Sequence, residues 1–232
     1  RLSRLNQLDN MVDAETIRLQ AFPMVRLQEK NESDAVDALK RAALKLFSER
    51  GVDGVTVREI AAAAGQRNHG AVGYHFGSKA ELIRILVVDG ASLIDARRNE
   101  ALDALMAAGG PAELEEIVRI LVYPSINLAP RGDVECYNRF VVLLSMAHRD
   151  LFMNALEDRW NTGYKRCVEM LRRWMTNIPK NEQTERIVFI EAYLGGVLSA
   201  RETRLADSTR THSTWSNDRV LEHFVQTIAA IV

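Results

Sequence analysis

The segment from Thr56 to Lys79 constrains this chain more than any other, because it carries helix start and stop signals at short spacing. Thr56 followed by Glu59 is a capping box, in which two side chains satisfy the backbone amides at a helix start. Gly65 is typical of a residue that ends a helix. Four polar residues, Gln66-Arg67-Asn68-His69, then supply donors at the start of the next helical piece. Two short helices joined by a tight turn are the layout of a helix-turn-helix, whose second helix enters the major groove of DNA.

A second capping box, Ser78 followed by Glu81, predicts a long helix that ends at Gly109-Gly110-Pro111. Apolar residues at steps of three and four predict an earlier helix from about Ser33 to Gly51. Beyond Pro111 the pattern stays helical, with helices expected at 112–122, 134–146, 150–175, 184–205 and 217–232. No alternating stretch of useful length suggests strands. We therefore expect an all-α fold, with an N-terminal three-helix helix-turn-helix domain joined by a long helix to a larger helical ligand-binding and dimerisation domain.

The chain divides into three expected parts. Residues 1–32 form an N-terminal arm or leader, residues 33–80 a helix-turn-helix DNA-binding domain, and residues 81–232 a helical ligand-binding and dimerisation domain. The arm carries five Lys or Arg against five Asp or Glu. This balance favours a plain leader over the alternative, a basic arm that reaches into a minor groove.

Composition limits the classes of function. The net charge of −1 excludes a uniformly basic chain, so DNA binding needs a local patch. Residues 33–80 supply one, with seven Lys or Arg against five Asp or Glu. Cys136 and Cys167 lack metal-ligand spacing and are expected to be reduced, buried thiols in the cytoplasm. No apolar run reaches the roughly 18 residues of a membrane span, so we expect no membrane partner. No catalytic or metal-ligand constellation stands out, so we expect neither an enzyme nor a cofactor.

The stretches AALKLFSERGVDGVTVREIAAAAG and AVGYHFGSKAELI resemble the DNA-binding domain of the TetR family of bacterial transcriptional regulators. The resemblance covers about Ala35 to Leu86, and the remainder is similar only in helical outline. It implies a pocket for a small effector in the larger domain. We expect a two-fold dimer because one such DNA-binding domain covers too little DNA for tight, specific binding. Two departures bear on base readout: the turn after Gly65 is one residue longer than in most members, and Gly73 stands where the family often has Tyr.

Two groups of DNA contacts are expected. Phosphate contacts come from residues at helix starts, where backbone amides carry partial positive charge, and from neighbouring polar side chains. Base contacts come from the polar turn, since Arg pairs with guanine edges and Asn or Gln with adenine. The phosphate set is Thr56, Arg58, Tyr74, His75 and Lys79, and the base set is Gln66, Arg67, Asn68 and His69. The alternatives are that Tyr74 and His75 lie at a domain interface and that His69 faces solvent.

The last two helices are the dimer candidates, because each carries a continuous stripe at helical spacing. One stripe has small residues, Ala192, Gly196, Ser199 and Thr203, and the other is apolar and includes Leu221, Phe224 and Ile228. Two such helices from each chain would form a four-helix interface in a homodimer. The alternative is that both stripes pack against the chain's own core.

The middle helices carry large residues with polar tips, which between helices can line a mostly apolar pocket. The candidate set is Tyr123, Tyr137, Phe140, His148, Phe152, Trp160 and Tyr164, with Asn138 and Arg139 as further polar anchors. Ordinary core packing is the alternative for each of them.

These features predict a repressor that binds a pseudo-palindromic double-stranded DNA operator as a dimer. A small hydrophobic or amphipathic effector would release it. The alternative is a helical small-molecule-binding protein or enzyme whose N-terminal helices only resemble a DNA-binding domain.

Overall fold

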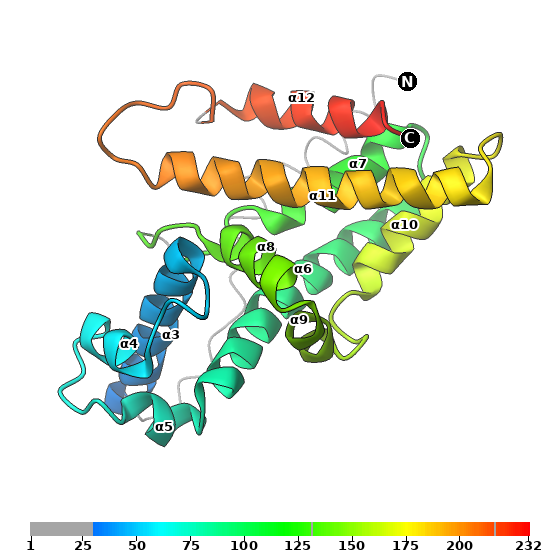
Figure 1. The fold of residues 1–232 in the computed structure, drawn as a ribbon. Helices are drawn as coiled ribbons and strands as arrows, with labels where there is room; N and C mark the ends of the chain where they lie inside the picture. Colours follow the sequence, from blue (N-terminus) through cyan, green and yellow to red (C-terminus); the bar gives the residue numbers. More distant parts are fainter. Residues whose placement is uncertain (1–29, 131, 216) are drawn as a thin grey trace. The chain divides into compact units, whose positions relative to one another are not determined.

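A computed structural model describes residues 30–130, 132–215 and 217–232, which contain ten α-helices and one 3-10 turn and no strand (Figure 1). The predicted all-α class is confirmed. Most of the predicted N-terminal arm lies outside the described residues. Residues 35–232 form one compact unit, and the division at residue 80 remains a prediction.

Three helices form the part that we call the head: α3 (Lys30–Arg50), α4 (Val57–Ala63) and α5 (Ala71–Phe76). They form because apolar positions repeat on one side of each helix, and those side chains meet in a shared core. Its fully buried members include Phe47 on α3, Ile60 on α4 and Val72 on α5. The head therefore has the three-helix arrangement that the sequence predicts.

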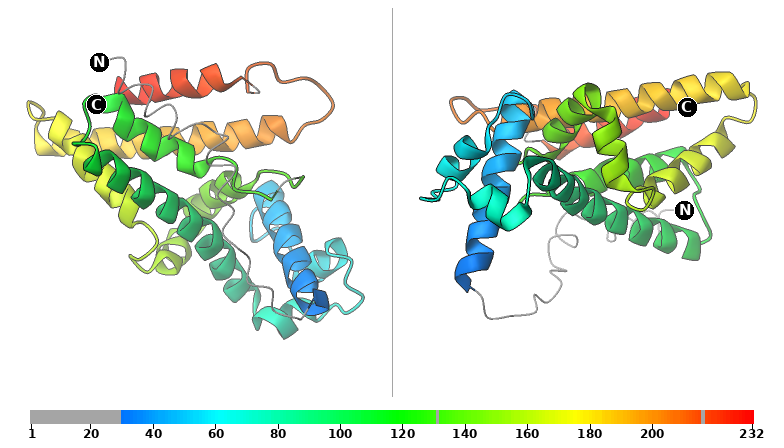
Figure 2. Two further views of the ribbon diagram at one scale, coloured as in Figure 1. Left: turned by 180° about the vertical axis from the view of Figure 1, so that it is seen from behind. Right: turned by 60° about the horizontal axis from the view of Figure 1, so that its bottom comes forward.

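The long helix α6 (Lys79–Ala107) follows the head and contributes to two separate cores. Its first half, from Leu82 to Ile94, packs with the head and with residues of α8 and α9. Its second half, including Leu102 and Leu105, packs with α7, α10, α11 and α12. In Figures 1 and 2 the helix runs from the head past α9 toward α7 and α10. The helix therefore links the two cores directly.

The middle of the chain contains one helix break that was not predicted from the sequence. After α7 (Leu114–Val122) and the 3-10 turn Tyr123–Ser125 come α8 (Tyr137–Ala147), α9 (Arg149–Leu156) and α10 (Thr162–Trp174). The single helix expected at 150–175 is thus two helices. Glu157 and Asp158 take left-handed backbone angles, with φ of 49° and 54°, and these end α9.

The last two helices, α11 (Lys180–Leu205) and α12 (Asp218–Ala229), lie side by side (Figures 1 and 2). One face of α11 is buried through Ile190, Leu194 and Leu198. Helix α11 also packs against α8. Since α8 contacts α3 through stacked rings of Phe140 and Phe47, with centroids 6.1 Å apart, α8 lies between α11 and the head.

Candidate DNA-binding surface

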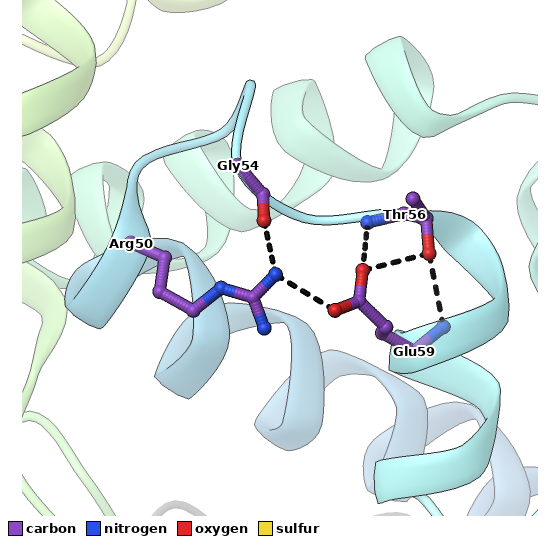
Figure 3. Close-up of polar contacts among 4 residues, drawn as sticks. All are labelled: Arg50, Gly54, Thr56 and Glu59. Carbon is purple, nitrogen blue, oxygen red and sulfur yellow. Dashed lines mark hydrogen bonds and ion pairs between the residues drawn. The ribbon is translucent and has the colours of Figure 1, made fainter.

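The start of α4 is closed by a network of hydrogen bonds around Glu59 (Figure 3). The Thr56 amide and hydroxyl each donate to Glu59 Oε2 at 2.7 Å, and the hydroxyl accepts from the Glu59 amide at 3.3 Å. Arg50 donates to Glu59 Oε1 at 2.7 Å and to the Gly54 carbonyl. The Thr56 amide and then the Arg50 guanidinium lower the pKa of Glu59 to about 2. The predicted capping box is confirmed.

This closure bears on the predicted phosphate contact at Thr56. The Thr56 hydroxyl already donates one hydrogen bond and accepts another. A phosphate at this helix start would also approach the ionised Glu59 carboxylate. The network therefore suits a structural role that fixes α4 against the end of α3.

The start of α6 is arranged differently. Ser78 Oγ accepts from the Glu81 amide at 3.0 Å, but the Glu81 carboxylate is held by Arg84 through contacts of 3.0 Å and 2.5 Å. Among the described contacts, the Ser78 amide donates nothing to that carboxylate, so the second predicted capping box is only half formed. Arg84 also lowers the pKa of Glu81. Because Arg84 binds the Glu81 carboxylate, the start of α6 suits a phosphate better than the start of α4 does.

The polar turn precedes α5 instead of forming its first residues, which corrects the prediction. Gly65 ends α4 with φ of 70°, and α5 begins at Ala71. Asn68 builds the turn: its side-chain oxygen accepts from the Gly70 amide at 2.8 Å, and its carbonyl accepts from the Ala71 amide at 3.1 Å. This leaves the Asn68 side-chain amide nitrogen as its available donor.

The exposed side of α5 carries few side chains. Val72 and Phe76 are buried, while Gly73 faces open space and Tyr74 is 75% exposed. His75 is half-buried and meets the Tyr74 ring edge-on, with centroids 4.8 Å apart. Glycine at position 73 therefore lets the backbone of α5 come close to a neighbouring surface.

Cations suited to phosphate remain exposed in the head. Arg58 and Arg67 are exposed, and among the described residues neither is in an ion pair. Lys79 is half-buried with its Nζ 5.9 Å from the centre of the Phe47 ring. By contrast, Arg50 is bound to Glu59. Gln66 is half-buried, whereas Arg67, Asn68 and His69 are exposed.

The predicted effector residues do not gather around one cavity. Tyr137, Phe140, Phe152 and Trp160 belong to the first core, and Tyr123 and Tyr164 to the second. Several have internal partners. Tyr137 donates to the Val87 carbonyl at 2.8 Å, Tyr123 donates to Glu222 at 2.7 Å, and His148 Nε2 lies 2.7 Å from Asp53 of the head. Their geometry is that of packed cores, the alternative given above.

The two predicted dimer stripes differ in exposure. On α11, Ala192, Gly196 and Thr203 are exposed and Ser199 is half-buried. On α12, Leu221, Phe224 and Ile228 are at most 6% exposed and face the chain's own core, which corrects their assignment to an interface. Two α11 residues beside the small stripe were not predicted: Val188 and Phe189 are 54% and 60% exposed.

Cys136 and Cys167 are free and buried, as predicted, and burial raises the pKa of each thiol to about 11. Within the described ranges, no three His, Cys, Asp or Glu side chains are grouped to hold a metal ion. No helix there is long and apolar enough to cross a membrane.

The head has the three-helix fold of a helix-turn-helix domain. Residues 39–85 match the family model described as bacterial regulatory proteins, tetR family. The predicted resemblance is confirmed for this domain: its sequence matches the family model of the TetR transcriptional regulators, and the match ends at residue 85.

One solved structure supports the fold, and a second is reported for comparison. A protein from Shewanella sp. PV-4 assigned to the tetR family of transcription regulators is 18% identical, with a TM-score of 0.50 over 85% of this chain and 95% of that one. The TetR family regulator PfmR from Thermus thermophilus is 17% identical, with a TM-score of 0.48 over 83% of this chain and 97% of that one. A search of curated protein sequences gave no match.

Proposed function

We propose that this chain is a ligand-responsive repressor that binds a pseudo-palindromic operator as a homodimer and acts in the cytoplasm. Two features of the head support the DNA contact. Arg58 and Arg67 are exposed, and α5 has no side chain at Gly73, so its backbone can approach DNA closely. The arginines supply charge for phosphates or guanine edges, and the glycine on α5 permits a close approach to a major groove.

The exposed face of α11 supports the dimer. Val188, Phe189, Ala192 and Gly196 recur at helical spacing on the side opposite the buried Ile190 and Leu194. Large apolar side chains beside small ones allow two helices to pack closely. Two heads would then read half-sites about 34–36 Å apart, or a multiple of that spacing.

Release by a small effector is part of the proposal because α6 belongs to both cores, and α8 contacts both the head and α11. A molecule that binds one arrangement of these helices more tightly than another shifts the population of heads able to bind DNA. The alternative function, a carrier or enzyme, requires no DNA binding and is tested by the same experiment.

The test is fluorescence anisotropy with the DNA upstream of the chain's own gene, at several salt concentrations. We expect Arg58→Ala with Arg67→Ala to weaken binding and to lower the slope of log affinity against log salt by about 1 for each phosphate that is no longer neutralised. Arg173→Ala is the matched control, since it removes an exposed arginine of α10 that pairs with Glu169. Binding that ignores salt, or a double variant that binds like the control, would refute a DNA-binding role for this surface.

A further inference from the structure

A cavity of about 680 Å³ lies between α3, α6 and the segment that leads into α8. Its size falls within the range of small-molecule sites in proteins, roughly 300–1,000 Å³. Apolar side chains from all three walls line it, including Leu44 of α3, Leu86 and Leu93 of α6, and Leu128 and Val134 of the segment. None of the predicted effector residues except Tyr137 lies on it.

Two apolar side chains at the cavity are unusually exposed. Leu93 is 38% exposed and Val134 is 47% exposed. Covering such surface with an apolar group contributes about 25 cal/mol for each Å² removed from water. The walls therefore favour an apolar occupant.

Five of the seven charged side chains that line the cavity have hydrogen-bond or ion-pair partners, and the other two, Asp37 and Lys45, carry opposite charges. Lys40 of α3 pairs with Asp89 of α6 at 2.9 Å, and Arg41 of α3 lies 3.7 Å from Asp133 of the segment. Glu135 accepts from two backbone amides of its own segment, at 3.1 Å and 3.0 Å. An ionic ligand would have to compete with these contacts, whereas an uncharged ligand would leave them in place.

We infer that this cavity binds a small, uncharged, largely apolar molecule, and that its occupancy alters the position of the head. The ligand would touch α3, which belongs to the head, as well as α6 and the segment before α8. It therefore favours the arrangement of these walls that fits it. The effect on DNA rests on the proposed function, but binding at the cavity does not.

The experiment uses Nile red, an uncharged dye that fluoresces in apolar surroundings, titrated into the full chain. We expect the double variant Leu93→Asp with Val134→Asp to bind the dye at least about tenfold more weakly than the unchanged chain. Both substitutions are at exposed positions, so the fold should persist, which a thermal melt checks. Met106→Asp is the matched control: Met106 is 50% exposed on α6 but does not line the cavity.

A second variant, Ala38→Phe, fills the cavity from α3 without adding charge and should also weaken dye binding. Equal binding by the unchanged chain and by both cavity variants would overturn the site. Tighter binding of the anionic dye anilinonaphthalene sulfonate, abolished in the same variants, would overturn the uncharged class.

Operator affinity is then measured with and without Nile red. We expect the dye to change it about tenfold or more in the unchanged chain and in Met106→Asp, but not in the cavity variants. A dye that binds at the cavity without changing operator affinity would overturn the coupling to the head. If the chain binds no DNA even without dye, the proposed function is contradicted. The dye titration still shows whether the cavity binds an apolar ligand.

Discussion

Glu202 on α11 accepts the backbone amide of Arg139 at the start of α8, over 2.8 Å. The same carboxylate, only 2% exposed, accepts from the Asn138 amide at 3.0 Å and from its side chain at 2.8 Å. Arg139 in turn donates to the Ser48 hydroxyl of α3 at 3.0 Å. A continuous series of hydrogen bonds thus joins α11, which carries the proposed dimer face, to the first helix of the head.

Replacing Glu202 by Gln should destabilise the fold. An amide nitrogen would replace one carboxylate oxygen, so at least one of the three donors from Asn138 and Arg139 would lose its acceptor. A buried group left unsatisfied costs about 1–3 kcal/mol, which urea unfolding would measure. Glu191→Gln, at an exposed position of the same helix, is the control and should leave the midpoint of urea unfolding unchanged.

The pH dependence of that effect has a defined sign. Burial raises the pKa of Glu202 above 4.5, so the folded chain holds this proton more tightly than the unfolded chain. The unchanged protein should therefore lose stability as pH rises from 4.5 through the raised pKa, and Glu202→Gln should lack that loss. If stability changed with pH in the same way in the two proteins, the raised pKa would not belong to Glu202.

Glu59 should give the opposite pH dependence. Its pKa falls from 4.5 to about 2 in the folded chain, so its contribution is fully present above 4.5 and is lost as pH falls toward about 2. Circular dichroism melts across this window should show a smaller loss for Glu59→Gln than for the unchanged chain. Glu49→Gln, an exposed change on α3, serves as the comparison. An identical acid transition in all three proteins would show that Glu59 does not contribute to it.

Two substitutions at Asn68 separate its turn-forming role from contact with DNA. Asn68→Asp keeps an acceptor for the Gly70 amide, whereas Asn68→Ala removes it at a cost of about 0.5–1.5 kcal/mol. We expect only the Ala variant to lower the melting temperature, while both weaken operator binding, the Asp variant by repulsion from phosphate. Undiminished operator affinity in both variants would show that this turn lies away from DNA.

A charge on the exposed face of α11 should disrupt the proposed dimer. Phe189→Asp would place a carboxylate in an apolar interface, where an unpaired charge is costly. Light scattering should report a monomer for this variant. Met146→Asp tests for a general effect of charge, since Met146 is 81% exposed on α8. A dimer that survives Phe189→Asp would place the interface elsewhere.

The head was predictable because its signals are local. Thr56, Glu59 and Gly65 determine helix boundaries through contacts within a few residues, and each acts as expected. Arg50, which completes the Glu59 network, was not predicted, because its contact crosses nine positions and depends on how α3 and α4 pack.

The other features that were not predicted also leave no local signal in the sequence. Glu157 and Asp158 end a helix by adopting left-handed backbone angles, although neither is a glycine or a proline. Helical spacing showed that Leu221 and Phe224 share a face but not which surface covers it. The cavity needs side chains from three separate parts of the chain, so its walls could not be assembled from spacing alone.

The burial of both thiols has a practical consequence for spectroscopy. Cys136 and Cys167 are at most 4% exposed and stay protonated near neutral pH, so neither should react readily with maleimide or nitroxide reagents. One cysteine introduced at Tyr74, which is 75% exposed, would then be the single reactive position in each chain. In the proposed dimer, pulsed electron resonance between two such labels would report the separation of the two α5 helices directly, with the natural cysteines left in place.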